Sequence, residues 1–244
     1  MSAGSRNIPI SASEAEPVAD SAPNPQLLNA LGRLVRGLSA LFWGLPIALV
    51  ICFQTAQGDW LRPLGVIPPI LATALLFYGL NLVGHFQKQE RIWRHSLDRA
   101  KIFGLINIGL SPFLYWWNKM PFHPFYGAIV ELMALSSLLF LFALNPLLCR
   151  LTAMLPDETL RIETRLFTML NRYLLLATTV LLAGFFVLVR IHQLPHQILN
   201  VLLLMDKLVL WIVLFLILLP IAVIMALIWK IKEVILASVF GTEQ

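Results

Sequence analysis

Charged residues are scarce in this sequence. They make up 13% of its 244 residues, while hydrophobic residues make up 59%. A soluble domain typically has about 25% charged and about 45–50% apolar residues, so this shortage excludes an ordinary soluble globular domain. The apolar residues are gathered in runs of about 20, the length with which a helix crosses a bilayer. The sequence therefore predicts an all-α polytopic membrane protein.

Motifs for catalysis and metal binding are also absent from the sequence. It has no CxxC, HExxH or GxSxG pattern and no glycine-rich phosphate loop, so nothing in it points to an enzyme. Its two cysteines, Cys52 and Cys149, are expected at opposite membrane surfaces about 30 Å apart. That separation excludes a disulfide between them, which requires Cα atoms within about 7 Å. We expect no catalytic residue, no cofactor and no metal site.

The net charge of +5 does not indicate nucleic-acid binding, because the basic residues stand beside the apolar runs. In that position they suit the anionic headgroups of membrane lipids. The expected partners are therefore membrane lipids on the cytoplasmic side and other membrane subunits, with no nucleic acid.

The apolar runs divide the chain into a tail and one membrane domain. Residues 1–26 are rich in Ser, Ala, Pro and acidic residues and are expected to form a disordered cytoplasmic tail. Residues 27–240 are expected to form a single six-span transmembrane domain, with a short tail at residues 241–244. The expected spans are approximately residues 37–56, 64–86, 102–117, 126–148, 174–189 and 207–229.

Two charged segments separate expected spans and combine their charge with a helical apolar stripe. Residues 87–101 carry five of the eighteen basic residues. Residues 156–173 carry an arginine stripe with leucine and aromatic residues opposite it. Both patterns are typical of helices that lie on a membrane surface, so we expect two cytoplasmic amphipathic, interfacial helices.

The distribution of basic residues predicts the orientation. Six spans place both termini on one side of the membrane. If residues 87–101 are cytoplasmic, only Arg62, Lys119, Arg190 and Lys207 lie outside, which leaves fourteen of the eighteen basic residues inside. By the positive-inside rule both termini are cytoplasmic, and the plasma (inner) membrane is the expected location.

Polar residues recur near the cytoplasmic ends of three expected spans. Asn81 and His85 belong to the second span, Asn107 to the third and Asn145 to the fourth. Together they could form a cytoplasm-facing pocket for a polar or anionic headgroup. The alternative is helix–helix packing, in which amides bond across the contact and small residues let helices approach closely.

Glu131 is the only acidic residue inside an expected span. A carboxylate at that depth needs a partner or a water-filled crevice. Lys119, His123 and Arg190 are expected at the same outer level and could pair with it. The alternatives are a proton- or cation-handling role and an unpaired, protonated acid.

The arginines of the two charged segments are candidates for a docking or lipid-headgroup surface. They either hold the topology through anionic lipid or bind an acidic partner. The candidates are Arg91, Arg94, Arg99, Arg161, Arg165 and Arg172.

Taken together, these patterns favour a non-catalytic, multi-pass integral membrane protein, an accessory or scaffold subunit of a larger membrane assembly. The alternative is a small transporter or lipid-handling membrane protein that uses the polar pocket. A membrane-embedded enzyme has the weakest support.

Overall fold

The computed structural model describes four ranges of the chain. They are residues 25–85, 91–154, 158–190 and 196–240. Side chains are described for residues 29–85, 92–154, 161–184, 187 and 215–237. The two predicted tails lie outside these ranges, except for residues 25 and 26.

Every regular element in these ranges is helical, which confirms the all-α prediction. The elements are α1 (Pro25–Gln57), the 3-10 turn η1 (Arg62–Leu64), α2 (Ile67–Val83), α3 (Arg91–Leu110), α4 (Phe113–Lys119), α5 (Pro124–Ala153), α6 (Glu158–Arg190) and α7 (His196–Phe240). Four helices contain a stretch long and apolar enough to cross a membrane. These stretches are Asn29–Gln57, Pro124–Ala153, Arg161–Gly184 and Phe215–Ala237.

The two charged segments are not separate surface helices where the structure describes them, contrary to the prediction. α3 continues from the basic segment into the third expected span, and α6 continues from the arginine-rich segment through the fifth. No proline interrupts α3 or α6, and α6 has no glycine before Gly184, so nothing breaks either helix at the expected junction. The apolar stripe of the basic segment (Trp93, Leu97 and Ala100) is buried in the protein.

The third expected span (residues 102–117) is divided between α3 and α4, so the six predicted spans do not appear as six long helices. α3 ends at Leu110, and Pro112 precedes the first residue of α4. Proline lacks a backbone N–H and disfavours a helical conformation in the residue before it. The hydroxyl of Ser111 donates a hydrogen bond to the carbonyl of Ile108 (2.9 Å) at this break.

α1 and α2 form an antiparallel pair with a leucine-rich contact. Leu38 and Leu41 of α1 and Leu80 of α2 are fully buried. Gly37 and Gly79 lie against each other's backbone, so the two helices approach closely at that point. Small residues permit this close approach, which is how helices pack where lipid surrounds them.

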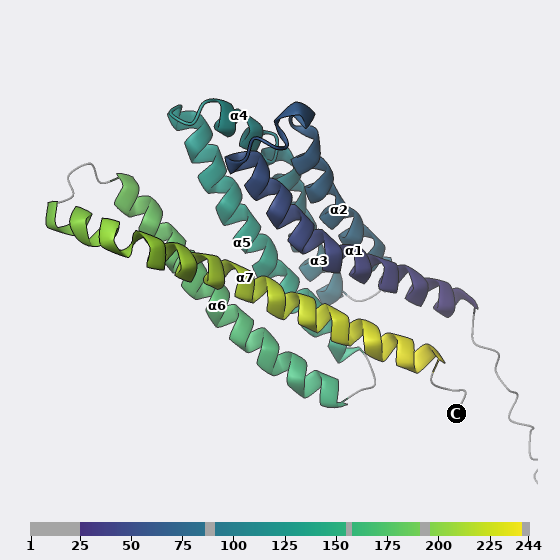
Figure 1. Ribbon diagram of the computed structural model, residues 1–244. Coiled ribbons are helices and arrows are strands. Elements are labelled where there is room, and N and C mark those ends of the chain that lie inside the picture. The colour runs from purple at the N-terminus through teal and green to yellow at the C-terminus, as the bar shows by residue number, and fades with distance from the viewer. Residues whose placement is uncertain (1–24, 86–90, 155–157, 191–195, 241–244) are drawn as a thin grey trace, which may run out of the picture.

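α5 is the central helix, and it contacts α3, α4, α6 and α7. Its buried face includes Phe140, Leu144 and Leu148. α7 crosses α6 at an angle and then lies beside α1 (Figure 1), and it buries Ile224 and Ile228 against this core. The core therefore consists mainly of leucine and isoleucine side chains, with Trp93 and Phe140 among them.

α4 is tied to the end of α1 by one side chain. The amide of Asn118 donates hydrogen bonds to the carbonyls of Thr55 (3.0 Å) and Gly58 (2.9 Å). Arg62 in turn donates to the side-chain oxygen of Asn118 (3.3 Å). Carbonyls at a helix C-terminus have no partner within the helix, so Asn118 satisfies groups that otherwise need water. The sequence analysis did not single out Asn118.

Candidate functional site

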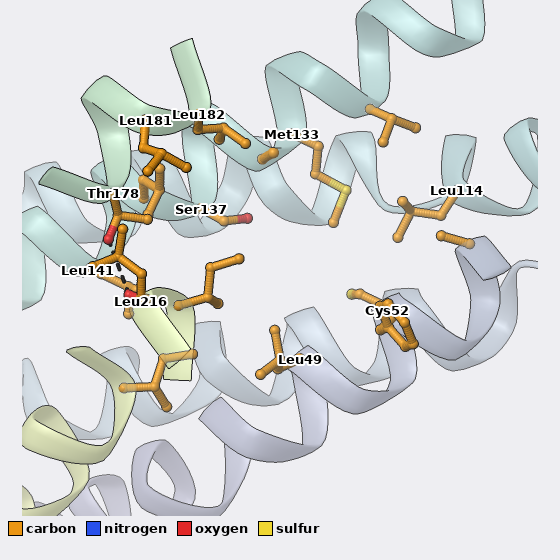
Figure 2. Close-up of a pocket in the computed structure, with 17 residues that line it drawn as sticks. Leu49, Cys52, Leu114, Met133, Ser137, Leu141, Thr178, Leu181, Leu182 and Leu216 are labelled. Carbon is orange, nitrogen blue, oxygen red and sulfur yellow. Dashed lines mark hydrogen bonds between the residues drawn. The ribbon is translucent and has the colours of Figure 1, made fainter. Parts of the chain in front are cut away.

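An apolar cavity of about 300 Å³ lies between α1, α5, α6 and α7, with one residue of α4 at its edge. Thr178 and Leu182 of α6 lie on one side of it, and Leu49 and Cys52 of α1 lie on the opposite side (Figure 2). Small side chains of α5, including Ala134, leave space between these helices. The cavity is partly open to the outside of the protein, so it is a recess between helices and not a closed void in the core.

None of the described residues that line the cavity is charged. Thr178 and Ser137 are the hydroxyl residues among them, and the Thr178 hydroxyl lies within hydrogen-bonding distance of the carbonyls of Leu174 (2.8 Å) and Leu216 (3.1 Å). The Thr178 hydroxyl therefore donates its hydrogen bond within the protein. An enclosed apolar cavity of about 150 Å³ binds small hydrocarbons, and this larger, partly open one has room for part of a hydrocarbon chain.

A second crevice of about 270 Å³ lies between α5 and α6 and contains Glu131. Thr179 is its other polar residue, and Leu182 lines both this crevice and the apolar cavity. Glu131 is half-buried and takes part in an interaction within the chain. The sequence predicted either a partner or a water-filled crevice for this acid, and the structure gives it an interaction within the chain beside a crevice lined mainly by alanine and leucine.

Buried amides join the C-terminal part of α5 to the first half of α6. The amide of Asn145 donates to the backbone carbonyl of Thr168 (3.0 Å), and the amide of Asn171 donates to the side-chain oxygen of Asn145 (3.4 Å). Thr164 and Asn171 are fully buried. Amide bonding between helices was the alternative expected for Asn145, but its partners on α6 were not identified from the sequence. The signal that could have revealed them is a mostly polar stripe whose Thr, Asn and Leu residues recur at alternating spacings of four and three. They lie at positions 164, 168, 171, 175 and 178.

The four residues of the predicted polar pocket fall into separate surroundings. A ring nitrogen of His85 lies 2.6 Å from the carbonyl oxygen of Asn81, near the end of α2, and His85 borders a depression with Arg33. Asn107 is buried on α3, and Asn145 bonds to α6. The hydrogen bonds described join neither Asn107 nor Asn145 to Asn81 and His85, or to each other. A common pocket remains a prediction.

The predicted basic surface is exposed where its side chains are described. Arg94, Arg99, Arg165 and Arg172 are exposed, and the side chain of Arg91 lies outside the described residues.

Arg161 is also exposed, and it has a structural contact of its own. It donates to the carbonyl of Ala153 (2.8 Å) at the end of α5. Glu163 forms an ion pair with Lys230, which links α6 to α7. Arg161 and Glu163 therefore join α6 to α5 and α7 near the start of α6.

Comparison with protein-family models, curated proteins and solved structures found no match for this chain. The described residues contain no group of three or more His, Cys, Asp or Glu side chains placed to hold a metal ion. The cavity and the crevice are therefore the features that bear on function.

Proposed function

We propose that this protein is a lipid-handling, multi-pass membrane protein that holds a hydrocarbon chain in the cavity between α1, α5, α6 and α7. The observation that carries the proposal is the size of this cavity together with its uncharged lining. Ligand sites are typically concave, largely apolar spaces of about 300–1,000 Å³ with few polar groups. The proposal follows the lipid-handling alternative but moves the site from the polar pocket to an apolar cavity.

The surroundings of the cavity limit how strongly a chain alone can bind. Transfer of a methylene group from water to an apolar site stabilises by about 0.8 kcal/mol. A lipid chain already lies in hydrocarbon, so this gain is absent, and binding must come from packing contacts. Selectivity among lipids then depends on polar groups beside the cavity.

The same proposal includes six membrane crossings with both termini cytoplasmic, in the plasma (inner) membrane. The excess of basic residues on the proposed inner side supports this orientation. At the proposed outer end, exposed Trp60 and Phe122 and the contact of Lys119 with the Tyr115 ring (5.0 Å) fit an interfacial aromatic belt. α2 has 17 residues, or about 26 Å of helix, and needs flanking residues to cross a core of about 30 Å.

Lipid retention tests the proposal. The purified protein is reconstituted in nanodiscs of one phospholipid, gently extracted, and weighed by native mass spectrometry. We expect about one retained lipid per chain. Ala134→Phe, which fills the cavity, should abolish retention, whereas Ala177→Phe on the exposed face of α6 should not. Equal retention by both folded variants, or none by the wild type, contradicts the proposal.

An accessory-subunit function is a second candidate, supported by one observation. Only 17% of the apolar stretch of α6 is buried, compared with 33–39% in the other three long apolar stretches. A partner helix could cover this face, with an acidic segment bound to the exposed arginines beside it. Stable co-purifying subunits in the native mass spectrum favour this function, and a lipid-loaded chain without other subunits favours the first.

A further inference from the structure

The crevice at Glu131 lies next to the apolar cavity, and the two share the side chain of Leu182. We infer that the ligand is an amphiphile with an ammonium headgroup, which binds at Glu131 and Thr179 while its chain enters the apolar cavity. This inference rests on the proposed lipid binding and adds the chemical class of the headgroup.

The polar groups of the crevice favour a ligand that donates hydrogen bonds. The Thr179 hydroxyl donates its proton to the carbonyl of Leu175 (2.8 Å), which leaves its oxygen as an acceptor. In the ionised form that this inference assigns to it, the Glu131 carboxylate only accepts hydrogen bonds, and its roughly four lone-pair sites leave room for a ligand beside the interaction it already makes. Two acceptors and a negative charge suit an ammonium group, since charge-assisted hydrogen bonds are about twice as strong as neutral ones. An anionic group of the ligand would be repelled by the Glu131 carboxylate.

The positions along α5 agree with a headgroup and a chain. Glu131 is seven residues after Pro124, so it lies about 10 Å from that end of the helix. The cavity follows α5 as far as Leu141, about 15 Å deeper. A lipid with its head at Glu131 therefore has its chain directed toward the middle of the membrane.

The remainder of the crevice is apolar, since its other lining residues are alanines and leucines. These side chains supply no hydrogen bond to a phosphate or a sugar. Among the described residues of the crevice, Glu131 and Thr179 are thus the ones that can recognise a headgroup, and both suit its ammonium group.

Headgroup competition tests the inference. The protein is reconstituted with phosphatidylethanolamine, phosphatidylglycerol and diacylglycerol of identical chains in equal amounts, and the retained lipids are measured by native mass spectrometry. We expect the wild type to prefer phosphatidylethanolamine. Glu131→Gln should retain the same total lipid but lose about tenfold in this preference, the scale of one lost hydrogen bond to a charged group.

Thr179→Val removes only the second acceptor and should lower the preference less, so the inference can be tested even if Glu131→Gln does not fold. Thr73→Val, which removes a similar hydroxyl bonded within α2, is its matched control and should leave the preference unchanged. An unchanged preference in both crevice variants overturns the ammonium inference but leaves lipid binding intact. Preference for diacylglycerol or phosphatidylglycerol in the wild type also overturns it. Loss of all retention in the wild type removes the proposed function itself.

Discussion

Gly37 of α1 and Gly79 of α2 lie face to face, and each is closed in by the other's backbone. A Cβ atom at Gly37 would lie 2.9 Å from the carbonyl oxygen of Gly79, and one at Gly79 would lie 3.1 Å from the carbonyl oxygen of Gly37. A flexible side chain could move away from such a contact, but a helix backbone cannot do so without moving the helix. The α1–α2 pair therefore depends on glycine at both positions.

Replacement of Gly37 by alanine should weaken this pair. We expect Gly37→Ala to lower the free energy of unfolding in detergent micelles by about 1–3 kcal/mol, the usual cost of overpacking. Gly32 is the matched control on the same helix, because nothing lies within 4 Å of a Cβ placed there. Gly32→Ala should be neutral or stabilise by up to about 1 kcal/mol through helix propensity. Equal losses in the two variants would contradict the close contact.

The hydrogen bond between Asn171 and Asn145 should appear as coupling between the two residues. In a double-mutant cycle of Asn145→Ala and Asn171→Ala, we expect a coupling energy of about 0.6 kcal/mol and at most about 1.7, the range measured inside membranes. Unfolding in mixed micelles supplies the measurement. A cycle of Asn145→Ala with Asn107→Ala is the control, because no described hydrogen bond joins that pair. Strict additivity of the first pair would rule out the contact.

The link from Asn118 to the end of α1 should control the loop that follows. Asn118→Asp keeps an acceptor for Arg62 but removes the donor to the carbonyls of Thr55 and Gly58. We expect a loss of about 1–3 kcal/mol, because a carboxylate facing two carbonyls leaves buried acceptors unsatisfied. Limited proteolysis should also cut residues 58–66 faster than in the wild type. Unchanged protection would mean that these bonds do not hold the loop.

The proposed orientation predicts opposite labelling of two exposed positions. In a variant with both natural cysteines changed to alanine, Asp59→Cys should react with a membrane-impermeant maleimide on intact cells. Asp98→Cys should react only after the membrane is opened, because the α3 end is proposed to be cytoplasmic. Both aspartates are exposed in the structure, so access within the protein is not limiting. The reverse pattern would invert the topology.

Much of the fold was predictable because hydropathy and helical period are local properties of the chain. The apolar runs at residues 37–56 and 126–148 became parts of α1 and α5. The boundaries of the surface segments were not predictable in this way. A charged stretch such as residues 156–173 can end a helix or continue it, and α6 continues because no breaker stands at the junction.

The site was less predictable than the fold. Single polar residues such as Glu131 stand out in an apolar sequence, and the structure places this one in a crevice. The apolar cavity had no signal, because Leu49, Cys52 and Leu141 resemble any other membrane residues in the sequence. A cavity forms where several helices fail to pack against one another, so no pattern within a single helix predicts it.

The sequence by itself determined that the chain is helical, that its long helices suit a membrane, and where most of them lie, because each property depends on neighbouring residues. Only the tertiary structure decided which stripe of α6 is buried. That helix carries an arginine, an apolar and a Thr/Asn stripe, and the stripe packed inside is the one with Thr164 and Asn171, while Leu166 and Tyr173 are exposed. In lipid an apolar stripe gains little from burial, whereas amides gain partners, so packing between helices makes this choice.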